Sequence, residues 1–198
     1  NPDLLKDSFS HPKINKLNYI VSDKSRKKRT LHINNYFSGI STVSINLIKN
    51  SRFYKGSKYQ KKLTTVFHKK INVNVITLDN LTKLYGIPDL IKIDVEGHEY
   101  EVIKGLRVKA KKITFEWAEE NFQILEKTVK ELQRIGYRKF GVVGFFDNKN
   151  HLNDKILFSR KGDPFLIEPN YYDWKEIELK KFISKSRRIN YGMIWVKT

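Results

Sequence analysis

At 198 residues without a single cysteine, the sequence suits one domain with a sizeable core and excludes a disulfide framework and a thiolate metal site. It has neither a run of about eighteen apolar residues nor, in residues 1–17, a secretory signal, so we expect a cytoplasmic protein without a membrane span. The formal net charge of +18 attracts anionic partners, and nucleic acid, anionic glycans, anionic lipid surfaces and nucleotide-linked sugars all fit it.

The first predicted strand covers residues 16–21 and ends at the polar pair Ser22-Asp23. Short polar side chains form turns and caps, which is sufficient to explain the pair from spacing alone. Residues 30–36 alternate well enough for a second strand, and we expect the two strands to form a hairpin across the basic turn at residues 25–29. The loop Ser38-Gly-Ile-Ser41 follows the second strand.

Lysines and aromatic rings are interspersed along residues 49–70. Basic side chains neutralise phosphates and aromatic faces stack on bases, so this segment is the best candidate for contact with a nucleic acid. A solvated loop of a lysine-rich protein has the same composition, and no base-reading motif such as an RRM or a zinc finger accompanies the segment. Both interpretations stay open.

The central stretch of the chain follows a predicted strand at residues 71–77 and a short helix at residues 78–85, capped by Asp79 or Asn80. Within it, β-branched residues alternate with charged ones over residues 90–96, and a glycine then turns the chain into a helix. In an open α/β sheet, ligands collect beyond the carboxyl ends of the strands. Function is therefore expected at this turn.

Helices and strands alternate after this turn. The predicted elements are a helix at 98–106, a strand at 113–117, a helix at 119–135 that Gly136 ends, and a strand at 139–146. Such alternation predicts an α/β fold with a mostly parallel sheet and helices on both faces. In the less regular tail we expect a short helix at 175–183 and a strand at 193–196 that pairs antiparallel at an edge.

The stretch Ile91-Lys-Ile-Asp-Val-Glu-Gly-His-Glu-Tyr-Glu-Val-Ile-Lys-Gly105 resembles the signature of the FkbM family of S-adenosylmethionine-dependent methyltransferases. Other pieces agree with the family in order: Val21-Ser-Asp23, Val75-Ile-Thr-Leu-Asp79, Ile113-Thr-Phe-Glu116, and Leu132 followed by Gly136-Tyr137. The resemblance covers residues 1–145 and weakens beyond them. It implies a Rossmann-like class I methyltransferase fold, in one domain over residues 1–198, with S-adenosylmethionine as cofactor.

The resemblance also implies a glycine-rich cofactor turn after the first strand of the fold and an acidic residue after the second. The sequence carries no Gly-x-Gly-x-x-Gly motif, and Asn1 resembles a point just after the second strand. We therefore expect that the N-terminal strands with the glycine-rich loop are missing from this chain. A degenerate cofactor site is the alternative.

Methyl transfer from a sulfonium is an in-line displacement that needs an aligned acceptor with a weakened proton. The resemblance implies O-methylation of a sugar, glycan or other small-molecule hydroxyl, and the charge allows an anionic acceptor. Asp94 is the first choice for orienting or deprotonating this hydroxyl, with Glu96, His98 and Glu116 as helpers. Hydrogen bonds to the start of the following helix are the structural alternative for Asp94 and Glu96, and a solvated position is the alternative for His98.

The resemblance places Ser22, Asp23 and Asp94 at the cofactor, with Ser22 and Asp23 near the adenine ring. Clustered carboxylates can instead hold a divalent cation, but no second set of ligands is visible, so metal dependence is not predicted. Two competing functions remain. One is a basic nucleic-acid-binding module whose catalysis has lapsed, and the other is an RNA-directed methyltransferase on the same scaffold.

Overall fold

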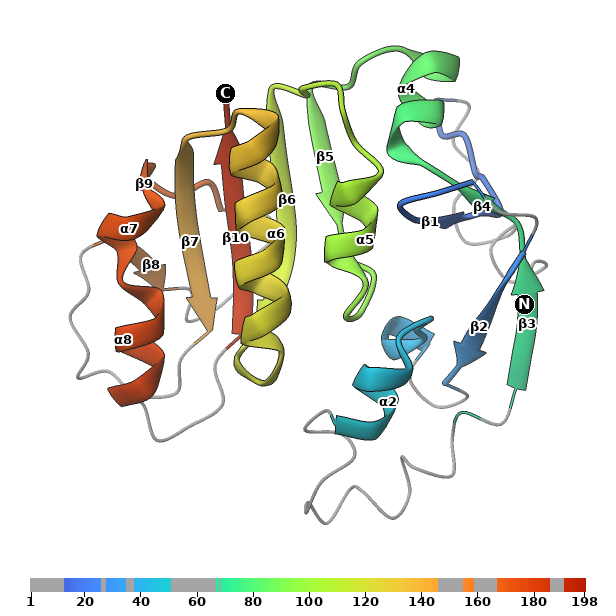
Figure 1. The fold of residues 1–198 in the computed structure, drawn as a ribbon, viewed down its shortest axis with the longest axis horizontal. Coiled ribbons are helices and arrows are strands. Elements are labelled where there is room, and N and C mark those ends of the chain that lie inside the picture. Colours follow the sequence, from blue (N-terminus) through green and yellow to red (C-terminus); the bar gives the residue numbers. More distant parts are fainter. Residues whose placement is uncertain are drawn as a thin grey trace.

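The computed structural model describes residues 13–25, 28–34, 38–50, 67, 69–145, 155–158, 167–185 and 191–198. Figure 1 shows how the helices and strands of these segments are arranged. Most of the lysine-rich and aromatic segment at 49–70 lies outside the described residues, so the nucleic-acid interpretation of that segment is not tested by the structure.

The larger sheet has six strands in the order β5-β6-β10-β7-β8, with β9 also paired to β7. Their bounds are β5 Leu90–Ile93, β6 Lys112–Ala118, β7 Lys139–Phe145, β8 Ile156–Phe158, β9 Tyr172–Asp173 and β10 Tyr191–Lys197. The pairs β5–β6 and β7–β8 are parallel, whereas β10 is antiparallel to both β6 and β7, and β9 is antiparallel to β7. The sheet is therefore mixed, and the expectation of a mostly parallel sheet is only partly right.

The C-terminal strand β10 lies inside the sheet, between β6 and β7, and not at an edge as the sequence suggested. Every residue from Gly192 to Val196 is buried, which is the pattern of a strand covered on both faces. Gly192 permits close pairing, because a Cβ at this position would lie 2.0 Å from the carbonyl oxygen of Val143. The apolar run at 192–196 was thus a signal for a central strand.

Five of the described helices pack against one face of this sheet. Their bounds are α4 Leu78–Tyr85, α5 Glu99–Lys104, α6 Phe122–Ile135, α7 Trp174–Ile177 and α8 Leu179–Lys185. Buried residues of all five helices belong to one core cluster with Phe115 of β6 and Ile194 of β10, and Figure 1 shows α5 and α6 in front of the strands. On the other face, the described residues form a smaller cluster of Val143, Met193 and Trp195. The expected cover of helices on both faces is therefore not seen in the described part.

The N-terminal strands form two small separate sheets. The strand β1, Ile20–Val21, pairs parallel with β4, Val75–Ile76, and β2, Arg29–Ile33, pairs antiparallel with β3, Lys69–Val73. The expected hairpin between the first two strands is wrong, and the expected strand at 71–77 is split in two. The side chains of Ile20, Val73 and Val75 share a cluster, so apolar contacts distant in sequence decided the pairing.

The predicted boundaries of the helices at 78–85, 98–106 and 119–135 were close to the observed ones, but the expected single helix at 175–183 is divided into α7 and α8 at Glu178, whose φ angle is 51°. Thr77, and not Asp79 or Asn80, caps α4, because its hydroxyl accepts a hydrogen bond from the Asn80 amide at 3.1 Å. Gly136 ends α6 in the left-handed conformation with φ 105°. Within the described ranges, none of the helices has the length and apolarity needed to cross a membrane.

Gly192→Ala is predicted to destabilise the sheet, because the added methyl group would collide with the Val143 backbone. Overpacking of this kind lowers the free energy of unfolding by about 1–3 kcal/mol or more. Gly39→Ala is the matched control, since a Cβ there meets nothing within 4 Å. Chemical denaturation measures both variants, and equal midpoints would contradict the central position of β10.

Candidate active site

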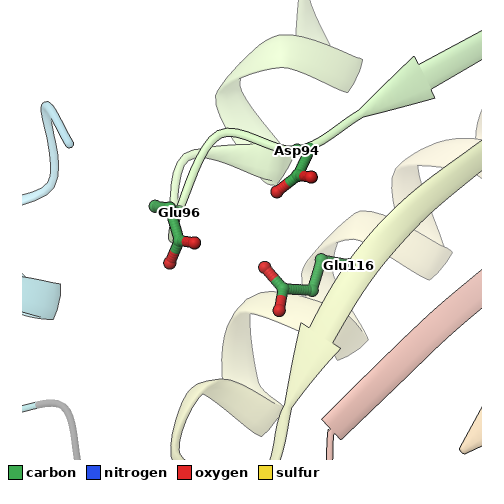
Figure 2. Close-up of side chains that lie close together, drawn as sticks. All are labelled: Asp94, Glu96 and Glu116. Atoms are coloured by element: carbon green, nitrogen blue, oxygen red, sulfur yellow. The ribbon is translucent and has the colours of Figure 1, made fainter. Parts of the chain in front are cut away.

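Two of the expected catalytic carboxylates meet because of the register between β5 and β6. Ile93 pairs with Phe115, and both side chains belong to the core cluster. Successive side chains of a strand point to opposite faces, so Asp94 and Glu116, one residue further on, lie side by side on the other face. Glu96 reaches them from the following loop. One carboxylate oxygen of each residue lies within 4.8 Å of the others. Figure 2 shows the three side chains directed toward a common space.

The loop that carries Glu96 has a strained backbone. Glu96 and Gly97 have φ angles of 51° and 84°, in the left-handed region. This region costs a residue with a side chain about 1–2 kcal/mol, so Glu96 needs other contacts to hold it there. A glycine is favoured at position 97 for two reasons. It adopts the positive φ angle without strain, and a Cβ there would lie 3.2 Å from the side chain of Leu47. Leu47 belongs to the short helix α2, Ile45–Asn50, which packs beside the loop.

Glu99 lies in the first turn of α5 and is 5% exposed. Its Oε1 accepts a hydrogen bond from the Gly97 amide at 3.0 Å. Burial raises the pKa of Glu99 to about 7, and the charge of Asp94 adds to the rise, while hydrogen bonds from the backbone oppose it. The sequence pattern did not indicate that this carboxylate would be buried.

His98, expected as a helper of Asp94, is not among the side chains that gather at the three carboxylates. Its ring is buried, with Nε2 2.9 Å from Nη1 of Arg29 and 3.1 Å from Oγ of Ser22, and Nδ1 3.3 Å from a carboxylate oxygen of Glu101. Burial, and then the positive charge of Arg29, lower the pKa of His98 to about 4. Because an arginine only donates, Nε2 of the neutral ring accepts, and Nδ1 carries the proton toward Glu101.

The expected cofactor residues Ser22 and Asp23 follow the end of β1 and lie beside α5. The Ser22 hydroxyl is 3.0 Å from Nη1 of Arg29 and 3.3 Å from a carboxylate oxygen of Asp23. Asp23 also lies 3.9 Å from Nζ of Lys104 at the end of α5. The structure thus brings together three of the four expected catalytic residues, and it places the fourth, His98, against Ser22, one of the three residues expected at the cofactor.

The three gathered carboxylates suit two kinds of ligand. Their spacing fits three ligand atoms of a divalent cation, although exposed acidic groups commonly gather without an ion. They can also accept hydrogen bonds from hydroxyl groups and attract a sulfonium cation. Nζ of Lys92 lies 3.4 Å from Asp94 and already supplies one positive charge there.

Sequence reasoning missed Thr42, Arg29 and the structural part played by Glu99. The hydroxyl of Thr42 donates to the carbonyl oxygen of Glu96 at 2.7 Å, across 54 residues of sequence. No local pattern connects residues so far apart. Only Glu99 had a signal, because it belongs to the stretch at 91–105 that carries the family resemblance.

The shifted pKa values of His98 and Glu99 predict opposite effects of pH on stability. The pKa of His98 is lowered from 6.5 to about 4. Its contribution to the free energy of unfolding is therefore present above pH 6.5 and is lost as the pH falls through about 4. The pKa of Glu99 is raised from 4.5 to about 7. Its contribution to the free energy of unfolding is therefore present below pH 4.5 and is lost as the pH rises through about 7. Thermal unfolding should show a flatter acid limb in His98→Gln and a flatter alkaline limb in Glu99→Gln. Variants that both keep the wild-type pH profile would contradict these assignments.

Comparison with known proteins identifies the family of this chain. The family model described as the methyltransferase FkbM domain matches residues 1–139, which include β5, the strained loop, α5 and β6. Searches of curated proteins and of solved structures returned no match. The family implies a class I methyltransferase fold, and the described residues form an α/β structure with a mixed sheet. The chain therefore belongs to the FkbM family and is a methyltransferase.

Proposed function

We propose that this protein transfers the methyl group of S-adenosylmethionine to a hydroxyl oxygen of a sugar or glycan. The observation that carries the proposal is the meeting of Asp94, Glu96 and Glu116 beyond the carboxyl ends of β5 and β6. Family membership gives the methyltransferase activity. The donor, the acceptor and the roles of the residues are what we propose.

In this reaction the acceptor oxygen attacks the methyl carbon in line with the carbon–sulfur bond, which breaks as the new carbon–oxygen bond forms. S-adenosylhomocysteine leaves as a neutral thioether, and the hydroxyl proton passes to a base. Asp94 is the proposed base, because its side chain is 38% exposed and is therefore within reach of an acceptor. Glu96 and Glu116 are proposed to accept hydrogen bonds from neighbouring hydroxyls, which would align the acceptor.

The charge of the site favours an acceptor without an anionic group at the reacting centre. Three carboxylates repel a phosphate or carboxylate placed beside them, whereas they attract the sulfonium of the donor. The net charge of +18 is suited to acidic groups elsewhere on the acceptor. A sugar hydroxyl on a glycan or nucleotide-linked sugar meets both conditions.

On the cofactor side, we propose that Ser22 and Asp23 orient the adenine ring. His98 is already hydrogen-bonded to Arg29 and Ser22, so in this proposal it fixes the serine at the end of β1 while Asp94 acts as the base. In this assignment His98 orients Ser22 and does not act as the base. This role suits a ring that stays neutral at pH 7.

The glycine-rich cofactor turn is proposed to come from a segment N-terminal to Asn1. Among the described strands, β5 is paired on one side only, by β6. A groove of about 440 Å³ lies along β5, and its apolar lining includes Val21, Leu81 and Ile91, while Leu90 is 46% exposed. Folded proteins avoid exposed apolar strand edges. We therefore propose that upstream strands complete the sheet here, in one domain with residues 1–198.

A second candidate, RNA-directed methylation or RNA binding without catalysis, is favoured by the net charge. Both versions of this candidate predict an affinity for RNA that falls steeply with added salt. RNA-directed methylation also predicts that labelled methyl groups appear in RNA. The acidic cluster at the sheet edge argues against it, because a phosphodiester backbone would have to approach the carboxylates. RNA is therefore included as an acceptor in the transfer assay below.

Calorimetric titration of the full-length protein with S-adenosylmethionine should show saturable binding. Asp23→Asn should weaken it by about tenfold, the effect of losing one charge-assisted hydrogen bond. Asp173→Asn is the control, since Asp173 pairs with Lys139 at the surface, outside the proposed site. Absence of binding in the full-length wild type would remove the proposed donor.

Asp94→Asn should lower kcat about 10²–10⁴-fold, the usual contribution of a general base, and should also weaken the binding of S-adenosylmethionine, because it removes one of the carboxylates that attract the sulfonium. The assay follows labelled methyl groups into neutral oligosaccharides, acidic oligosaccharides and RNA. Glu126→Gln removes a surface carboxylate of α6 and serves as the control.

We expect the activity to survive a chelator, because Lys92 already neutralises charge beside Asp94. Loss in the chelator with recovery on adding Mg²⁺ would assign the carboxylates to a metal ion instead.

A further inference from the structure

The strained loop at residues 94–97 is held from two sides by groups that are distant from each other in the sequence. Thr42 binds the carbonyl oxygen of Glu96, and Glu99 binds the amide of Gly97. These are consecutive residues with positive φ angles, so the two hydrogen bonds act on the part of the loop where the backbone is least favourable. The direction of the Glu96 side chain depends on that backbone.

Thr42 is itself fixed in place. It is buried, and its amide and carbonyl group form a pair of hydrogen bonds with His32 of β2, at 3.0 and 2.9 Å. Its hydroxyl accepts a hydrogen bond from the Ser44 amide at 2.9 Å while it donates to Glu96. A hydroxyl with both its donor and an acceptor position engaged has one orientation. Thr42 is therefore a rigid support for the loop.

Glu99 is the second support. It projects from the helix that follows the loop, is almost entirely buried, and its carboxylate reaches back to the Gly97 amide. The side chain of Leu47 lies against Gly97, so the loop has no room to relax toward α2. Burial raises the pKa of Glu99 to about 7, so a glutamine is a close replacement for its neutral form.

We propose that Thr42 and Glu99 are positioning residues of the methyl transfer, which hold residues 94–97 in the one conformation that brings the Glu96 carboxylate to Asp94 and Glu116. This inference rests on the proposed function for its catalytic part. Neither residue touches the reacting atoms in this account. Both act through the backbone of Glu96 and Gly97.

Two pairs of variants separate positioning from general stability. Thr42→Val removes the hydroxyl at nearly constant volume, and Thr42→Ser retains it. Glu99→Ala removes the acceptor for the Gly97 amide, and Glu99→Gln retains an oxygen there. Glu126→Ala, on the surface of α6, is the control for the loss of a carboxylate.

Hydrogen exchange of the peptide containing residues 95–98 is the first readout, because it needs no activity. Thr42→Val and Glu99→Ala should speed exchange there by about tenfold, the effect of losing one hydrogen bond of average strength. The conservative variants, the control and the peptides of α6 should stay at the wild-type rate. If Glu99→Ala does not fold, Thr42→Val, which loses only a hydroxyl, carries the test.

The second readout is the split between kcat and KM in the labelled transfer assay, with the oligosaccharide that the wild type methylates as acceptor. We expect kcat to fall by about tenfold in Thr42→Val with KM nearly unchanged, and Thr42→Ser to restore it. Unchanged exchange in folded Thr42→Val would overturn the proposal, as would faster exchange with a wild-type kcat. A wild type that methylates no acceptor would count against the proposed function, and the exchange result would then decide the support of the loop on its own.

Discussion

The pairing of β5 with β6 is the constraint on which the candidate site depends. Ile93 and Phe115 are aligned and buried on one face, so the next residue of each strand must point to the other face, where the carboxylates of Asp94 and Glu116 meet. A slip of one residue would turn the carboxylates toward the core, at a large cost in solvation. The apolar packing on one side of the sheet thus sets the distance between acidic groups on the other.

The loop and the start of α5 connect the two halves of the site. Glu96 and Gly97 belong to the acidic side, and the next residue, His98, is hydrogen-bonded to Ser22 and Arg29 on the side expected to hold the cofactor. A displacement of the loop would therefore move residues on the acidic side and on the side expected to hold the cofactor. The strand, the strained turn and the helix α5 therefore form one unit, and this unit is the stretch that carries the family resemblance.

The sequence predicted this unit well because its signals are local. Alternation in residues 90–96, the glycine at 97 and the helical spacing up to Gly136 are all read over short distances. What the sequence could not supply depends on contacts between distant segments. These include the pairing of β10 with β6 and β7, the pairing of β1 with β4, the burial of His98 and Glu99, and the hydrogen bond from Thr42 to Glu96. The register between β5 and β6 brings the three expected carboxylates together, whereas His98, expected beside them as a helper, is buried against Ser22 and Arg29.

The central claim is that Asp94, Glu96 and Glu116 face the methyl group during transfer. A crystal structure of the full-length protein with bound S-adenosylhomocysteine tests it most directly. The account predicts that the sulfur atom faces the three carboxylates, with room for a hydroxyl oxygen about 3–3.5 Å from the position that the methyl carbon of S-adenosylmethionine would occupy. A sulfur atom directed away from these carboxylates, or a cofactor bound at another edge of the sheet, would contradict it.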